Sequence, residues 1–221
     1  MRKAILTFGL KRSKKYLSDK YSAEWFYKFR KISTENFDKI DSKVPGIGKS
    51  IFSLNYNFGP AYISWYLALE ELGVDKDERD KIIWKINENI YSWIPQWGFH
   101  IIGKSYFESY RKNAQSHIAR QNSKDGVHPF DWQIEFRNIS KQCYEIDIKR
   151  CGLKILSEYF GAEGLLPGIC RIDYMLAAMM GSGFERTKTL GDGDECCNCR
   201  YLKVGETQWK PEKGYYGRER K

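Results

Sequence analysis

Residues 130–150 read FDWQIEFRNISKQCYEIDIKR, and this stretch decides the fold prediction. Its apolar residues recur at every second position, whereas those of the helical patterns between residues 59 and 121 follow a period of about 3.6. Two alternating sets stand on either side of a short connection: Trp132, Ile134 and Phe136, then Tyr144, Ile146 and Ile148. Alternation of this kind is typical of half-buried strands. We therefore predict two strands here, separated by a short connection.

The chain after these strands predicts two helices and two more strands. Cys151–Phe160 and Cys170–Met180 have helical patterns that end at glycines, and a loop with Gly164, Pro167 and Gly168 separates them. Phe184–Leu190 and Cys196–Lys203 follow as strands, with a hairpin turn over residues 191–195. The order β-β-α-α-β-β indicates an α+β fold with a four-stranded antiparallel sheet covered by helices.

The N-terminal half is predicted to be mostly helical. Helical patterns cover residues 24–32, a helix opened by Gly59-Pro60 that ends at Gly73, one capped by Asp77 that runs to about Trp93, and one over residues 104–121. We expect a single domain over residues 1–221, with its site in residues 130–203. A basic segment, 1–55, and a loose polar tail, 205–221, would be appendages.

Composition and charge narrow the classes of function. Hydrophobic residues make up 42% of the chain and charged residues 29%, which are globular values. The 15% of aromatic residues predict a ring-rich core, and some of the rings should line a pocket. The net charge of +9 comes largely from the two ends, without a basic stripe or a recognisable nucleic-acid module. We therefore expect a small-molecule partner and neither nucleic acid nor membrane.

The expected compartment indicates the chemical state of the six cysteines. The apolar run over residues 4–10 is too short to span a membrane and lacks a signal-peptide cleavage site, so we expect a cytoplasmic protein. In a reducing compartment these cysteines are thiols or ligands rather than a disulfide framework. Cys196 and Cys199 have the C-x-x-C spacing of zinc and redox sites, but a strand would point them to opposite faces. We therefore predict no bound metal and no cofactor.

The densest set of reactive residues lies between positions 151 and 200. Cys170 and Asp173 are three residues apart, so they would share one helix face, and a helix start at Cys170 would favour its thiolate. The alternative is a buried structural thiol beside an acidic residue that complements the helix dipole. Arg186 and Arg200 fall on neighbouring predicted strands, where two guanidinium groups would clamp a carboxylate. Their alternative is an exposed pair of sheet-face arginines.

Four short segments together resemble the L-2-amino-thiazoline-4-carboxylic acid hydrolase family. They are Cys151, Cys170-Arg171-Ile172-Asp173, Arg186-Thr187-Lys188-Thr189-Leu190-Gly191 and Cys197-Asn198-Cys199-Arg200. The resemblance implies a hydrolase that opens a small cyclic amidine-like acid by thiol- or carboxylate-assisted attack on a C–N or C–S carbon. It implies catalytic roles among Cys170, Asp173, Cys197 and Cys151.

The resemblance also implies substrate binding by Arg186, Arg200 and Thr187. The chain departs from the family pattern at Asn198, usually Asp, and at Cys199, usually aromatic. If that Asp takes part in the chemistry, the departures bear on activity or substrate. A second hypothesis is a non-enzymatic sensor of a small ligand or metal, because the predicted organisation also resembles that of vinyl-reductase-type sensor domains.

Overall fold

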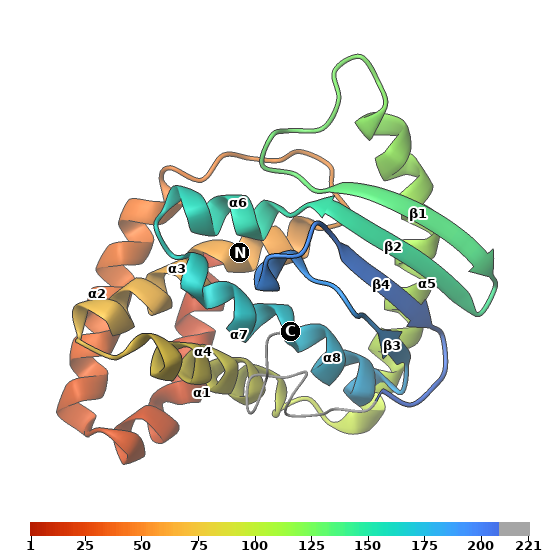
Figure 1. Ribbon diagram of the computed structural model, residues 1–221. Helices are drawn as coiled ribbons and strands as arrows, with labels where there is room; N and C mark the ends of the chain where they lie inside the picture. Colours follow the sequence, from red (N-terminus) through yellow and green to blue (C-terminus); the bar gives the residue numbers. More distant parts are fainter. Residues whose placement is uncertain (208–221) are drawn as a thin grey trace.

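The computed structural model describes residues 1–207 and has the predicted α+β architecture (Figure 1). The four strands are β1 (Gln133–Ser140), β2 (Cys143–Arg150), β3 (Gly183–Glu185) and β4 (Cys197–Leu202). They form one antiparallel sheet in the order β1-β2-β4-β3, so the two strands that the alternation predicted are confirmed as neighbours. Part of the tail predicted at 205–221, residues 208–221, lies outside the described residues.

The N-terminal half is helical, as predicted. Its helices are α1 (Arg2–Lys20), α2 (Ala23–Asp41), α3 (Ser53–Glu71), α4 (Lys76–Tyr91) and α5 (Gln96–Gln121). Residues 1–55 were expected to be an appended basic segment, yet Leu6, Phe26 and Phe37 are almost fully buried in the same core cluster as α3 and α4. The basic residues of α1 and α2 therefore lie on the outside of core helices, and the segment is part of the packed structure.

The sheet has an inner face packed on helices and an outer face that is charged. Tyr144, Ile146 and Cys199 are buried on the inner face, whereas Glu145 and Arg200 alternate with them on the other side. Figure 1 shows α5 passing behind the sheet. Helix α8 (Ile172–Met180) packs beside β3. Three shorter elements pack on α3 and α4: α6 (Gly152–Tyr159), the 3-10 helix η1 (Glu163–Leu165) and α7 (Leu166–Cys170).

Helix α5 is tied to the edge strand β1 by a side chain. The amide of Gln121 donates to the Ile134 carbonyl at 3.1 Å and accepts from the Ile134 backbone N–H at 2.8 Å. One turn earlier, Nε2 of the buried His117 lies 3.1 Å from the carbonyl of Trp132. These bonds fix the register between α5 and the sheet, and so the position of everything that α5 carries toward the inner face.

Three helix starts differ from the prediction. Helix α3 begins at Ser53 and contains Pro60, because burial of Tyr56 in the core stabilises a turn before the proline. Asp75, not Asp77, caps α4, since its carboxylate accepts the N–H of Glu78 at 2.9 Å. Helix α5 starts at Gln96, directly after Pro95, rather than at residue 104.

The region between α6 and β4 also departs from the prediction. The segment with Pro167 and Gly168 is helix α7 rather than a loop, because proline is tolerated in a first helical turn. Strand β3 ends at Glu185 instead of Leu190, and the 3-10 helix η2 (Leu190–Asp192) lies in the connection to β4. The Asn198 side chain explains why β3 ends at Glu185. Its oxygen accepts hydrogen bonds from the N–H groups of residues 187 and 188, at 3.0 and 2.7 Å, in place of a strand partner.

None of the helices within residues 1–207 combines the length and the apolar character that a membrane span requires.

Candidate functional site

A partly buried ion pair lies between α8 and the inner face of the sheet. Arg186 leaves the end of β3 and donates from Nη1 to Oδ2 of Asp173, in the first turn of α8, at 2.8 Å. Its other terminal nitrogen donates to the carbonyl of Cys170. The guanidinium lies 5.4 Å from the ring centre of Tyr174 and 5.3 Å from that of Phe184. These contacts hold Arg186, whose side chain is 4% exposed, in one orientation.

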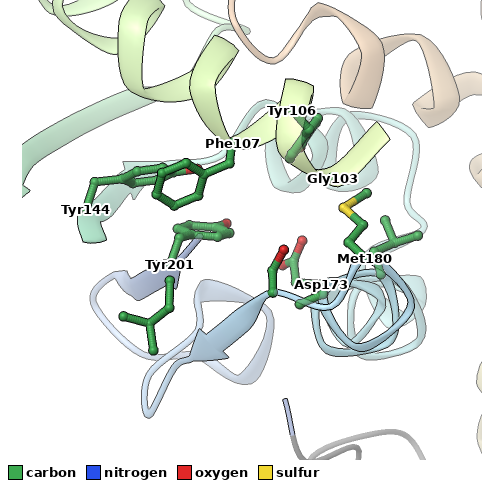
Figure 2. A pocket seen from close by; sticks show the side chains of 11 residues that line it. Gly103, Tyr106, Phe107, Tyr144, Asp173, Met180 and Tyr201 are labelled. Carbon is green, nitrogen blue, oxygen red and sulfur yellow. The ribbon is translucent and has the colours of Figure 1, made fainter. Parts of the chain in front are cut away.

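The carboxyl group of this pair lines two cavities. The smaller, of about 40 Å³, lies between α5, α8 and the sheet, and Figure 2 shows Asp173 pointing into it beside Tyr201 and beneath Tyr106. The larger, of about 190 Å³, lies among α3, α5 and α8. Tyr106, Asp173, Leu176 and Met180 line both cavities and so separate them. Asp173 keeps 33% of its side-chain surface accessible, which is what a cavity-lining acid needs to reach a ligand.

The surroundings of Asp173 hinder its ionisation and leave it able to exchange a proton. Burial raises the pKa of the Asp173 carboxyl above its ordinary value, and the charge and hydrogen bond of Arg186 partly oppose this rise. Burial also raises the pKa of Tyr91 to about 12 and that of Tyr201 well above its ordinary value, so both phenols stay neutral. A carboxyl group with a raised pKa in a cavity is a candidate general acid or base.

Cys170 does not have the position that the sequence predicted. It is the last residue of α7 rather than the first of a helix, and Arg171 separates it from α8. The helix-start argument for its thiolate is therefore wrong, and burial raises the pKa of Cys170 to about 12. The thiol lies against Gly191, where an added Cβ would be only 2.6 Å from the sulfur. Cys170 lines neither cavity.

Of the other cysteines of the predicted site, Cys197 and Cys199 are buried, whereas Cys151 is partly buried like Cys170. Cys197 and Cys199 share the inner face of β4, because residues two apart on a strand point to the same side. The sulfur of Cys197 accepts the N–H of Leu190 at 3.2 Å. Burial raises the pKa of Cys199 to about 12 and that of Cys151 further still. Within residues 1–207, no group of three or more His, Cys, Asp or Glu side chains is arranged to hold a metal ion.

This burial leads to a prediction about thiol reactivity. The folded chain should react with Ellman's reagent near neutral pH at well under one thiol per chain during a few minutes, because buried protonated thiols react slowly. The chain unfolded in guanidinium should react at six thiols, since all six cysteines are free. Rapid loss of one thiol in the folded protein, mapped by mass spectrometry to Cys170, would contradict this account and restore the thiol as nucleophile.

Arg200 and Thr187 lie apart from the ion pair. Arg200 is 48% exposed on the outer face, with its nitrogens 3.8 Å from Glu145 and 3.7 Å from Glu185. It borders a groove there together with Arg186, but the Arg186 guanidinium is turned inward to Asp173. The predicted two-arginine clamp is therefore not formed. The hydroxyl of Thr187 accepts a hydrogen bond from the amide nitrogen of Asn198 at 2.8 Å. Because the amide oxygen of Asn198 accepts the Thr187 N–H, both ends of this amide bind the loop.

The tyrosines that line the cavities have no sequence pattern that predicts a role in a site. Tyr106 falls within the helix predicted over residues 104–121, and Tyr144 and Tyr201 fall within predicted strands. The aromatic content correctly predicted ring-lined space but could not tell which rings would line it. The pair of Asp173 and Arg186, by contrast, combines two residues that the sequence had singled out for separate roles.

A family model described as L-2-amino-thiazoline-4-carboxylic acid hydrolase matches residues 58–201, which is more than half of the chain. The matched range begins within α3 and ends in β4, so it contains the ion pair, all six cysteines and the residues between the two cavities. None of the curated proteins matches the chain.

Proposed function

This chain belongs to the L-2-amino-thiazoline-4-carboxylic acid hydrolase family, and from that premise we propose that it hydrolyses an amidine-like ring carbon with Asp173 as its general acid and base. The observation that carries the proposal is the placement of Asp173. Its carboxyl group faces both cavities while Arg186 fixes one of its oxygens. A catalytic acid or base needs this combination of access and fixed geometry.

The proposed reaction adds water across a ring bond. The Asp173 carboxylate takes a proton from a water molecule as the water oxygen attacks the carbon bonded to two nitrogens and one sulfur. The ring C–N or C–S bond then breaks, and the protonated Asp173 returns the proton to the departing nitrogen or sulfur. Arg186 is a positioning residue in this scheme, because it donates a hydrogen bond to Oδ2 of Asp173 and so fixes the orientation of the carboxyl group. The phenols of Tyr106 and Tyr201 stand beside the reacting centre as neutral hydrogen-bonding groups.

The chemistry of the thiols supports a carboxylate mechanism over a thiol mechanism. Near neutral pH, only a very small fraction of a thiol with a pKa of about 12 is a thiolate, which is the nucleophilic form, and Cys170 and Cys199 both have such values. Cys151, Cys170 and Cys197 also line neither cavity, whereas Asp173 lines both. We therefore assign the three cysteines a packing role around η2 and the start of β4.

Ring opening of 2-amino-2-thiazoline-4-carboxylate tests the proposal. We expect proton NMR to show loss of the ring signals at a rate proportional to protein concentration. The product shows which bond breaks, because cleavage of C–S yields a new thiol and cleavage of the ring C–N bond a new amine. Binding of 2-aminothiazolines without any turnover would reject the hydrolase and favour the sensor hypothesis.

A further inference from the structure

The larger cavity has an apolar lining around one charged group. Its walls include Leu54, Phe58, Ile102, Leu153, Ile172 and Met180. Leu54 of α3 is 55% exposed and Ile102 of α5 is 43% exposed, so the cavity meets the surface between these two helices through an apolar mouth. Apolar walls stabilise a ligand in proportion to the apolar surface that it buries there. A thiazoline carboxylate, which is a small ring with two polar groups, offers little surface of that kind.

The charge in the two cavities is negative and confined to one residue. Among the lining residues within 1–207, neither cavity contains a lysine, arginine or histidine, and Asp173 is the only carboxylic acid. Arg186 occupies Oδ2 of Asp173, and no hydrogen bond to Oδ1 is formed within the same residues. An amidinium group would donate to Oδ1 and lie against the faces of the lining tyrosines. A carboxylate in the same place would meet a like charge in a poorly solvated cavity.

We propose that this site selects a cationic amidine with an apolar substituent, in preference to an amidine that bears a carboxylate. The amidinium pairs with Asp173 at the boundary of the two cavities. The apolar substituent occupies the larger cavity and extends toward the mouth at Leu54 and Ile102. This inference rests on the proposed function, in which the same carbon of the amidine is attacked, and it names the substrate class.

Three probes of one shape separate the effect of charge from that of size. Benzamidine, benzamide and benzoate have the same ring and nearly the same outline, but they are cationic, neutral and anionic. In calorimetric titration of the full chain, we expect benzamidine to bind at least tenfold more tightly than benzamide, and benzoate more weakly than either. 4-Butylbenzamidine should bind at least tenfold more tightly than benzamidine. Tighter binding of benzoate, or no gain from the butyl group, would overturn the proposal.

Two variants locate the charge preference. Asp173→Asn keeps the shape and removes the charge, so benzamidine and benzamide should then bind within threefold of each other. Retained benzamide binding shows that the site of this variant is folded. Glu185→Gln removes a carboxylate from the exposed outer face and should leave the wild-type preference unchanged. A preference that survives in Asp173→Asn would refute the assignment to this carboxyl group.

The same compounds distinguish failure of the inference from failure of the proposed function. Hydrolysis of 2-amino-4-phenyl-2-thiazoline should exceed that of 2-amino-2-thiazoline-4-carboxylate in kcat/KM by at least tenfold. Faster turnover of the carboxylate would reject the inference and keep the hydrolase. Tight binding of the amidine probes without turnover of either thiazoline would reject the hydrolase and keep the ligand class.

Discussion

Asp173→Asn should lower kcat for ring opening by about a thousandfold, which is within the range for loss of a general acid or base. Asparagine preserves the outline of the side chain and can accept the Arg186 hydrogen bond, but it cannot take a proton from water. The measurement is the initial rate of ring opening at saturating substrate. Because the change is confined to proton transfer, the apparent KM should change far less than kcat when a neutral thiazoline is the substrate.

The pH profile gives this prediction a readout that a structural role would not change. Burial raises the pKa of Asp173, so the kcat/KM of the wild type should fall on acidification at a pH higher than an ordinary aspartate would give. The carboxylate is the form that accepts the proton, so activity belongs to the pH range above that pKa. The residual activity of Asp173→Asn should lack this acidic limb, that is, the fall of kcat/KM on acidification. Glu185→Gln is the matched control, and an acidic limb retained in Asp173→Asn would assign the base elsewhere.

Arg186→Met should destabilise the fold by about 3–5 kcal/mol near neutral pH, the usual cost of leaving one partner of a buried ion pair alone. The lower part of this range is expected because a third of the Asp173 side chain faces the cavities. Methionine fills much of the arginine volume, so the effect reports the lost charge more than a void. Arg186→Lys should lose less stability than Arg186→Met, since lysine keeps the charge. It should still be less stable than wild type, because lysine cannot bond both Asp173 and the Cys170 carbonyl.

The pH dependence of this destabilisation has a definite sign. Without Arg186, the pKa of Asp173 rises further above its value in the unfolded chain, so ionisation favours the unfolded state. The deficit of Arg186→Met relative to wild type should therefore be small at acidic pH, where Asp173 is protonated, and should grow as pH rises. Urea unfolding at two pH values measures it. The double variant Arg186→Met/Asp173→Leu should recover most of the loss, and a double variant as unstable as the single one would exclude the ion pair as the cause.

The strongest features of the fold could be predicted because they depend on local patterns. The alternation in residues 130–150 predicted β1 and β2, and the strand predicted over Cys196–Lys203 is β4. Prediction failed where a single tertiary contact overrides the pattern. Strand β3 ends early because of the Asn198 side chain, eleven residues from Thr187. Pro167 and Gly168 were read as helix breakers, although Gly168 lets the backbone of α7 approach the Asp80 carbonyl closely.

The candidate site could be predicted in its residues but not in its arrangement. Asp173 and Arg186 were selected for their chemistry, yet the sequence gives no distance between α8 and the end of β3. The two-arginine clamp assumed that Arg186 continues a strand next to Arg200, and the early end of β3 removes that assumption. The smaller cavity depends on α5, α8 and the sheet meeting, and the larger on α3, α5 and α8 meeting. No local pattern encodes such a meeting of separate elements.

The bonds between Gln121 and Ile134 bear on how this chain behaves at high concentration. Strand β1 is at the edge of the sheet, and an open edge is a template onto which a strand of another molecule can pair. The side-chain amide of Gln121 offers Ile134 the donor and the acceptor that such a strand would bring. Added pairing at the start of β1 must first displace Gln121, so self-association through this edge is discouraged by the helix that supports the cavity.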